Sequence, residues 1–445
     1  MTPSARPQVM DRPLKRVVHE ATQQKGMELV QALSSMWTTP ASRFDELLQE
    51  LAVPHRRSER WKYSPVAGVW STYEASKHST AIEAGCERCP IPGLDAYRFV
   101  FVNGVFDPEA SDLPVHDGGV FQPHAKRSME ELELTNEDPT QSDWFAALNG
   151  KFASDGVRIQ VNPGVALDRP ILIHHHTSGT GAANFLSHAI EVGEGARVQL
   201  IHWSTAASDA TGMVNIMTRI HVGQGAQVSL DKVQDEEGAV HHFAFESIEQ
   251  GQASTAKVHT ATVRGKWVRN DMAFRLKGPG ADAVLNGVFL PSGSEFVDNH
   301  TTVDHREPHC TSSENYKGIL YDKSQGVFNG KVFVRPDAQQ TNAYQQNANI
   351  LASDRAQMNA KPELEIYADD VKCSHGCTIG QFDDEAMFYA QSRGIGLEAA
   401  RSMLVHAFIG EVLEGIAVPE VKMEVEHRLS EKHGWMVWSD SPLDA

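Results

Sequence analysis

The chain has 445 residues, more than the roughly 250–300 at which a single hydrophobic core stops growing, so we expect several domains or a repeat that extends in one direction. A formal net charge of −18 opposes binding to nucleic acid or to an anionic membrane surface. No apolar run approaches the ~18 residues that cross a bilayer, so we predict no membrane span and no nucleic-acid partner.

Residues 1–28 are polar and basic around Lys15 and Arg16, and they lack the apolar core of a secretory signal. We interpret them as a disordered polar leader. Organellar targeting stays open, although Asp11 and Glu20 are unusual in a transit peptide. Five cysteines, an odd number scattered through a long chain, indicate a reducing compartment, and we expect the cytoplasm.

Residues 29–155 are assigned to an N-terminal region that begins with helices and continues as a small mixed α/β module. Apolar residues follow helical spacing from Gly26 to about Glu50, with an interruption at a proline, and Ser42 is placed to cap the second helix. Between residues 61 and 122 short apolar pieces broken by glycine and proline replace that pattern.

A repeat of about 30 residues follows. The segment 161–167 is echoed by 192–198 and by 222–228, at offsets of 31 and 30, and weaker copies come after them. Each unit ends one strand, turns on a glycine and begins another strand. Such units bury their apolar faces only by stacking on one another. We therefore predict a β-helix of about eight turns over residues 156–380.

Residues 381–445 return to helical periodicity and are assigned to a C-terminal helical region. One helix is expected from about residue 397 to 415. Its apolar stripe includes Leu404, Phe408 and Val412, and this stripe is wider than an ordinary surface helix buries. The excess apolar surface must pack on the chain's own domain or on a partner.

Most of the known nucleotide-binding and metal-binding motifs are absent from the sequence or incomplete. No phosphate-binding loop and no dinucleotide-binding glycine motif occurs, so neither ATPase nor dehydrogenase chemistry is supported. Cys86 and Cys89 have the spacing of half a zinc site without a second ligand pair. The histidine tract 174–176 alternates between the faces of an extended segment, which favours surface or stacking positions over a metal site. The group at 300–310 is also best explained structurally.

The segment 372–377, Lys-Cys-Ser-His-Gly-Cys, is different because Cys373, His375 and Cys377 share one face if it forms a strand. A thiol and an imidazole two residues apart lie about 7 Å apart along a strand, which suits them to present ligands to a shared metal or to a facing chain. By spacing alone, a pair of small buried cysteines beside a hydrogen-bonded histidine stays an open alternative.

The segment 361–376, continued by 379–381 and 392–394, closely resembles the SufB/SufD family of iron–sulfur cluster assembly proteins. The pieces 61–63 and 101–104 support the resemblance, which covers nearly everything from about residue 30 onward. Within the family, the Cys-Ser-His-Gly motif is more similar to the SufD branch than to its paralogue SufB.

The resemblance implies a mainly β fold, with a right-handed parallel β-helix core flanked by an N-terminal helical and mixed region and by C-terminal helices. It also implies a non-catalytic scaffold subunit that pairs with a SufB-type paralogue and binds the ABC-type ATPase SufC through the C-terminal helices, here the helix with Leu404, Phe408 and Val412. A homodimer in isolation is left open.

Carried over from the family, His375 and Cys373 lie at the surface that faces the paralogue. Iron or a nascent Fe–S cluster would be handled there transiently, with His375 as a metal ligand, and no cofactor is expected to be tightly bound to the isolated chain. Cys377 departs from the family pattern, so its role stays open.

Two other classes of protein are alternatives. A carbohydrate-active β-helix enzyme needs paired carboxylates or a calcium site in a groove, and the spaced acids Asp282, Glu295, Asp298 and Asp304 do not indicate one. A self-assembling structural β-helix is disfavoured because the polar helical ends cap the stack. Co-purification with an ABC-type ATPase would separate the three classes.

Overall fold

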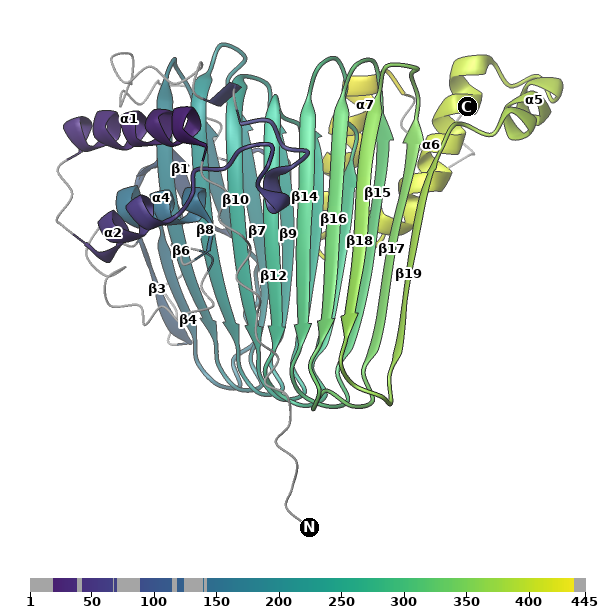
Figure 1. Ribbon diagram of the computed structural model, residues 1–445. Helices are drawn as coiled ribbons and strands as arrows, with labels where there is room; N and C mark the ends of the chain where they lie inside the picture. Colours follow the sequence, from purple (N-terminus) through teal and green to yellow (C-terminus); the bar gives the residue numbers. More distant parts are fainter. Residues whose placement is uncertain are drawn as a thin grey trace.

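A computed structural model describes residues 19–37, 42–66, 68–69, 89–113, 118–123, 139 and 142–435. Two facing sheets of mostly parallel strands make up most of it (Figure 1). Beyond β4, successive strands alternate between the sheets, so that each consecutive pair completes one turn of a solenoid. The predicted β-helix and the mainly β class are thereby confirmed.

The first sheet has ten strands in the order β19-β17-β15-β13-β11-β9-β7-β5-β1-β2, and the second has nine in the order β18-β16-β14-β12-β10-β8-β6-β4-β3. The strands of the first sheet are β1 Tyr97–Val102, β2 Val105–Phe106, β5 Ile171–Thr177, β7 Arg197–Ala206, β9 Gln227–Glu236, β11 Thr255–Arg264, β13 Asp282–Phe289, β15 Thr311–Leu320, β17 Asn342–Leu351 and β19 Lys372–Gly380. Those of the second sheet are β3 Gly119–Pro123, β4 Val157–Val161, β6 Ala182–Val192, β8 Thr211–Val222, β10 Ala239–Gln250, β12 Trp267–Leu276, β14 Phe296–His305, β16 Gln325–Val334 and β18 Gln357–Ile366.

Glycines make the turns of the early repeats. Gly164, Gly195 and Gly225 have φ values of 73°, 63° and 64°, a left-handed conformation that costs glycine little because it lacks a Cβ. In the next turn Ala253 takes this conformation, with φ 51°. The same backbone shape therefore continues where the sequence signal fades.

The solenoid begins earlier than residue 156. β1 pairs with β5 in parallel, and β3 pairs with β4 antiparallel, so both sheets extend into the region predicted to be a separate mixed module. These strands are short and are interrupted by glycine and proline. Their pairing with strands of the repeat makes them part of the solenoid.

Helices of the N-terminal region pack on the outer face of the second sheet (Figure 1). They are α1 Glu20–Met36, α2 Arg43–Glu50, the short η1 Glu59–Trp61 and α4 Trp144–Phe152. Helix α1 starts inside the predicted leader, which is a correction. Its polar first turns are held because Gln23 bonds the backbone of Leu51 and Val53, at 3.3 and 2.9 Å. Ser42 is at the N-cap of α2, as predicted.

Helices of the C-terminal region are α5 Asp384–Ser392, α6 Leu397–Leu413 and α7 Pro419–His433. α6 and α7 pack on the outer face of the first sheet, where the buried Val405 and Ile409 belong to one apolar cluster with Trp203 and Val288. Much of the wide apolar stripe of α6 is thus covered by the chain itself. α5 projects beyond the last strands (Figure 1).

The space between the two sheets, called the lumen below, is filled by side chains. Apolar residues such as Leu200, Leu230 and Leu285 fill much of it. Among the described residues, no helix is long and apolar enough to span a membrane.

Candidate functional site

The predicted site residues lie on β19, the last strand of the first sheet, which together with β18 forms the open end of the solenoid (Figure 1). In the pairing with β17, Cys373 lies opposite Ala343, His375 opposite Gln345 and Cys377 opposite Asn347. The three β17 partners are 0–2% exposed and face the lumen. The same three positions of β19 therefore continue the lumen-facing side, although nothing in the described chain stacks over them.

The shared face of the three residues follows from the strand geometry that the sequence predicted. Ser374, between Cys373 and His375, lies opposite Tyr344, which is 52% exposed on the outer side of the sheet. His375 and Cys377 are exposed and Cys373 is half-buried. The alternative of a buried cysteine pair beside a satisfied histidine is not what the structure shows.

Both thiols of β19 are unactivated in the isolated chain. Burial raises the pKa of the Cys373 thiol, against a smaller opposing effect of the Ala343 backbone, and burial also raises the pKa of Cys377. Both groups are therefore protonated at neutral pH, and they would have to lose a proton to ligate a metal. Among the described residues, no cluster of three or more His, Cys, Asp or Glu is arranged to hold a metal ion.

Behind His375 a column of polar side chains runs into the lumen. Gln345 donates from Nε2 to Oε2 of Glu314 at 2.6 Å, and Glu314 is only 2% exposed. Burial raises the pKa of Glu314 to about 7, while hydrogen bonds from Thr301 and from Gln345 oppose this increase. The sequence analysis missed Glu314, although the offsets of 31 and 30 residues between 314, 345 and 375 match the repeat.

The neighbouring column is also polar. Asn347 donates to the Tyr316 carbonyl at 3.1 Å, and Asn349 donates to Asn347 Oδ1 at 2.6 Å. Amide side chains in stacked strands can hydrogen-bond to one another as ladders along the stack. The amides of Gln345, Asn347 and Asn349 mostly bond to other groups, whereas a ladder bond does occur between Asn270 and Asn299 at 2.9 Å.

The histidine tract is not at the surface, which corrects one of the two expectations for it. His175 faces the lumen, where its Nε2 lies 3.0 Å from Nε2 of His188, while His174 and His176 both bond Thr205. Burial lowers the pKa of His175 well below its usual value, and the neighbouring His188 adds to this effect. The tract splits between two faces, as its alternation predicted.

The group at 300–310 and the spaced acids do not converge on one site. Asp304 binds Arg335 at 2.9 Å, Glu295 binds Lys432 at 2.6 Å, and Asp282 bonds Thr311. His305 bonds Ser312, and Cys310 donates to the Gly278 carbonyl at 3.4 Å. Each of these groups has a structural partner.

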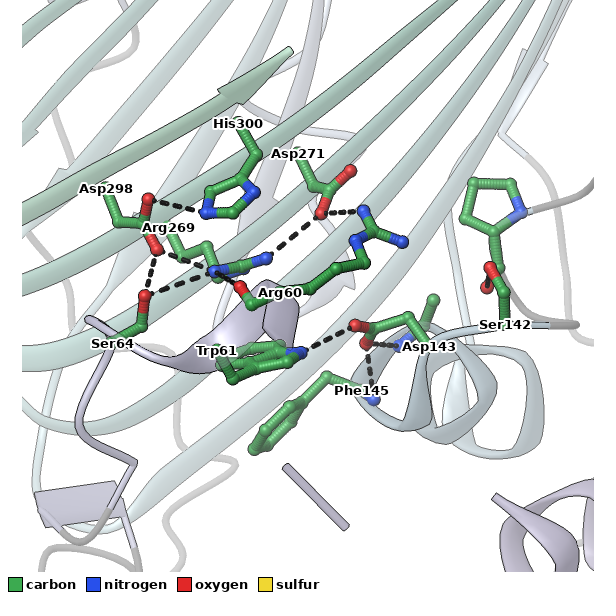
Figure 2. A network of polar contacts seen from close by, with 12 residues as sticks. Arg60, Trp61, Ser64, Ser142, Asp143, Phe145, Arg269, Asp271, Asp298 and His300 are labelled. Carbon is green, nitrogen blue, oxygen red and sulfur yellow. Dashed lines mark hydrogen bonds and ion pairs between the residues drawn. The ribbon is translucent and has the colours of Figure 1, made fainter. Parts of the chain in front are cut away.

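Asp298 and His300 belong to a buried network on the outer face of the second sheet (Figure 2). Asp298 accepts from Arg269 at 2.6 Å, from Ser64 and from His300 at 3.1 Å. Burial acts to raise the pKa of Asp298, but His300 and Arg269 outweigh it and hold that pKa below its usual range.

The same network reaches the N-terminal helices. Arg60 pairs with Asp271 at 2.5 Å, and Trp61 donates to Asp143 at 3.1 Å (Figure 2). Asp143 also caps α4 by accepting from the backbone of Phe145 and Ala146. The network fixes residues 60–64 and the start of α4 to the solenoid, and none of its carboxylates is free to act on a substrate.

The predicted ATPase-docking residues on α6 are unequally exposed. Val412 is 3% exposed within the apolar layer under α6, so it packs inside the chain, which is a correction. Leu404 and Phe408 are half-buried. The large apolar side chains that are exposed on α5 and α6 are Phe388 at 73%, Tyr389 at 61%, Leu397 at 46% and Met403 at 36%.

Of the Cys86 and Cys89 pair, Cys86 lies outside the described residues. Cys89 is half-buried and donates to the Ile91 carbonyl at 3.3 Å. This hydrogen bond gives the Cys89 thiol a structural contact within its own loop.

Comparison with known proteins gives two family matches. The profile described as "SUF system FeS cluster assembly, SufBD core domain" matches residues 174–408, and "SufBD protein N-terminal region" matches 29–173. The chain is 29% identical to iron–sulfur cluster assembly protein SufD of Escherichia coli K12, over 92% of this chain and 96% of that protein.

Two further relatives are similar to most of the chain. A SufBD family iron–sulfur cluster assembly protein of Synechocystis is 29% identical over 85% of this chain and 87% of its own length. Protein ABCI7, chloroplastic, of Arabidopsis thaliana is 30% identical over 72% of this chain and 69% of its own length.

Proposed function

The chain belongs to the SufB/SufD family of iron–sulfur cluster assembly proteins, and from this premise we propose that it is a non-catalytic scaffold subunit that pairs with a SufB-type paralogue and binds a SufC-type ABC ATPase. Iron or a nascent cluster is handled at the surface shared with the paralogue and is cargo. No cofactor is tightly bound to the chain alone. The proposed location is the cytoplasm, where free thiols such as Cys373 and Cys377 persist.

The observation that carries the proposal is the open end of the solenoid. Within the described part of the chain, β18 and β19 each have one unpaired edge, and an unpaired strand edge offers backbone donors and acceptors to another chain. Four large apolar side chains are 40–52% exposed at or near this end: Tyr344, Ile366, Tyr367 and Ile379. A paralogue with a similar open end would cover both the edges and these side chains.

Iron handling follows from the donors that β19 presents. Imidazole and thiolate are both good iron ligands, and Cys373, His375 and Cys377 face one side of the strand. The thiols are protonated in the isolated chain. The paralogue must therefore supply the remaining ligands, and the positive charge of the incoming metal must favour the thiolate forms. We propose His375 as the ligand and Cys373 as its neighbour, with Cys377 as a third donor.

ATPase docking is assigned to the C-terminal helices. The support is the exposed apolar surface of Phe388 and Tyr389 on α5 and of Leu397 and Met403 on α6, the helix that α5 contacts. A shallow hollow lined by Asp383, Glu385, Phe388, Tyr389 and Ser392 adjoins it. Leu404 and Phe408 of α6 are half-buried, and Val412 is buried in the apolar layer that holds α6 on the sheet.

The test is co-expression of the chain with its paralogue and ATPase, followed by iron and sulfide analysis of the purified complex. His375→Ala should lower the cluster content several-fold while both partners still co-purify. Ser374→Ala is the control, because Ser374 points to the outer side. Wild-type cluster content in the His375→Ala complex would refute the role of the histidine, and failure of the partners to co-purify with the wild-type chain would refute the scaffold role.

A further inference from the structure

Gln345 is buried between a carboxylate and the candidate iron ligand. Its Nε2 donates to Glu314 at 2.6 Å, so its amide oxygen Oε1 is directed away from that bond. Oε1 is buried and has no hydrogen-bond partner among the described residues. Side chains at paired positions of adjacent strands lie about 5 Å apart, and the side chain paired with Gln345 on β19 is His375.

The space for this amide is built by a glycine of the opposite sheet. A Cβ added to Gly330 of β16 would lie 2.4 Å from Gln345 Nε2 and 2.9 Å from its Cδ. Any larger residue at this position would displace the amide. The lumen is thus shaped to hold Gln345 between Glu314 and the open end.

We propose that Gln345 is a positioning residue for the imidazole of His375, an inference that rests on the proposed role of His375 in iron handling. The protonation state of Glu314 determines whether the oxygen or the NH₂ group of the Gln345 amide faces His375. With Glu314 ionised, Gln345 donates to it and its oxygen accepts one ring N–H of His375, which leaves the other ring nitrogen free for a metal. With Glu314 protonated, its O–H donates to the amide oxygen. The amide is then reversed, and its NH₂ meets the ring and competes for the ligand nitrogen.

Glu314 can be either protonated or ionised near neutral pH because burial raises its pKa to about 7. No charged side chain pairs with it among the described residues. Thr301 of β14 hydrogen-bonds it, and on β15 it is flanked by Tyr316 and by Ser312, which bonds His305 of β14. Its neighbours in the stack are Leu285 of β13 and Gln345 of β17.

Co(II) binding to the full chain tests the proposal without requiring cluster assembly. The apparent dissociation constant is measured anaerobically from thiolate-to-cobalt absorption at pH 6 and pH 8, for wild type and for His375→Ala, Gln345→Leu and Glu314→Gln. Gln250→Leu is the control, because Gln250 is equally buried but bonds the Ser254 and Asp282 carbonyls far from β19.

We expect Gln345→Leu to weaken Co(II) binding about 10-fold or more at pH 8, as removal of a group that orients a ligand commonly does. Glu314→Gln should weaken it at pH 8 and approach wild type at pH 6, where Glu314 is protonated in the wild type. Gln250→Leu should bind as wild type.

Three results would overturn the proposal, and they separate it from the proposed function. If His375→Ala weakens binding but Gln345→Leu does not, Gln345 has no positioning role while the metal role of His375 stands. If the ratio of wild-type to Glu314→Gln affinity is the same at both pH values, Glu314 does not select the amide orientation. If His375→Ala binds Co(II) as tightly as wild type, His375 is not a metal ligand, and Gln345 then has no ligand to position.

Discussion

The guanidinium carbon of Arg269 lies 3.8 Å from the centre of the Trp61 indole ring, which places a cation of the second sheet directly over an aromatic side chain of the N-terminal region. Arg269 is 1% exposed and also binds Asp298, so the contact is both a cation–π interaction and part of a buried ion network. The two residues are more than two hundred positions apart in the chain, and they join the helical region to the solenoid.

Breaking this network should cost stability. Asp298→Ala leaves the buried Arg269 without its closest carboxylate, and loss of one partner of a buried pair costs about 3–5 kcal/mol. Urea denaturation of the purified chain measures the effect. The control is Glu398→Ala, which removes an exposed pair with Arg401 at 3.7 Å and should change the free energy of unfolding by less than about 0.5 kcal/mol. Equal small effects of both substitutions would contradict the structural role of the network.

The raised pKa of Glu314 predicts a pH-dependent stability. In the folded chain Glu314 keeps its proton up to about pH 7, whereas an unperturbed glutamate releases it near 4.5. The favourable contribution of the protonated group is complete below pH 4.5 and is lost as the pH rises through 7. This loss corresponds to about 3 kcal/mol.

Glu314→Gln has no proton to lose and, like the protonated carboxyl, can donate a hydrogen bond to the Gln345 amide oxygen. Relative to wild type, this variant should therefore gain about 2.5 kcal/mol in stability between pH 5 and pH 8. Thermal unfolding at both pH values tests it. A stability difference that does not change with pH would show that Glu314 titrates normally.

The exposed aromatic residues of α5 are expected to bind the ATPase. Phe388 is 73% exposed, so Phe388→Asp should leave the stability within about 0.5 kcal/mol of wild type. The same substitution should reduce ATPase capture about 10-fold or more, as loss of an aromatic anchor does at many interfaces. Retention of the ATPase by this variant would move the docking surface elsewhere.

Phe408→Ala is the matched comparison on α6. Phe408 packs on the apolar layer between α6 and the first sheet, and Lys317 Nζ lies 5.5 Å from its ring centre. Its truncation should lower the free energy of unfolding by about 2 kcal/mol. If Phe408→Ala instead weakens ATPase capture at full stability, the original assignment to α6 is the better one.

The sequence predicted the solenoid because its repeat reflects the backbone conformation of the turns. A glycine such as Gly195 recurs where the backbone needs a positive φ. The alternation of side chains along each strand then places every second residue in the lumen. The same alternation correctly put Cys373, His375 and Cys377 on one face. Local patterns were sufficient for these features.

Other features depend on contacts that no local pattern reveals. The stripe of α6 showed excess apolar surface but could not show that the first sheet covers Val412. Helix α4 was missed, although Asp143 before an apolar run is a capping signal. Glu314 was missed because a carboxylate in a strand is usually solvated, and only the stacking register shows that it lies behind Gln345 and His375.

The open end of the solenoid provides the last prediction. Ile379 lies on β19 and is 46% exposed, so a charge there is tolerated by the isolated chain but would be buried once another chain covers the strand. Ile379→Lys should therefore unfold like wild type within about 0.5 kcal/mol, while burial of an unpaired charge at the interface weakens pairing with the paralogue by several kcal/mol. Val120→Lys is the matched control, because Val120 is 41% exposed on β3 at the opposite end of the stack. Size-exclusion chromatography of the co-expressed subunits should show loss of the complex for Ile379→Lys alone. An intact complex with Ile379→Lys, or its loss with Val120→Lys, would place the pairing surface away from β19.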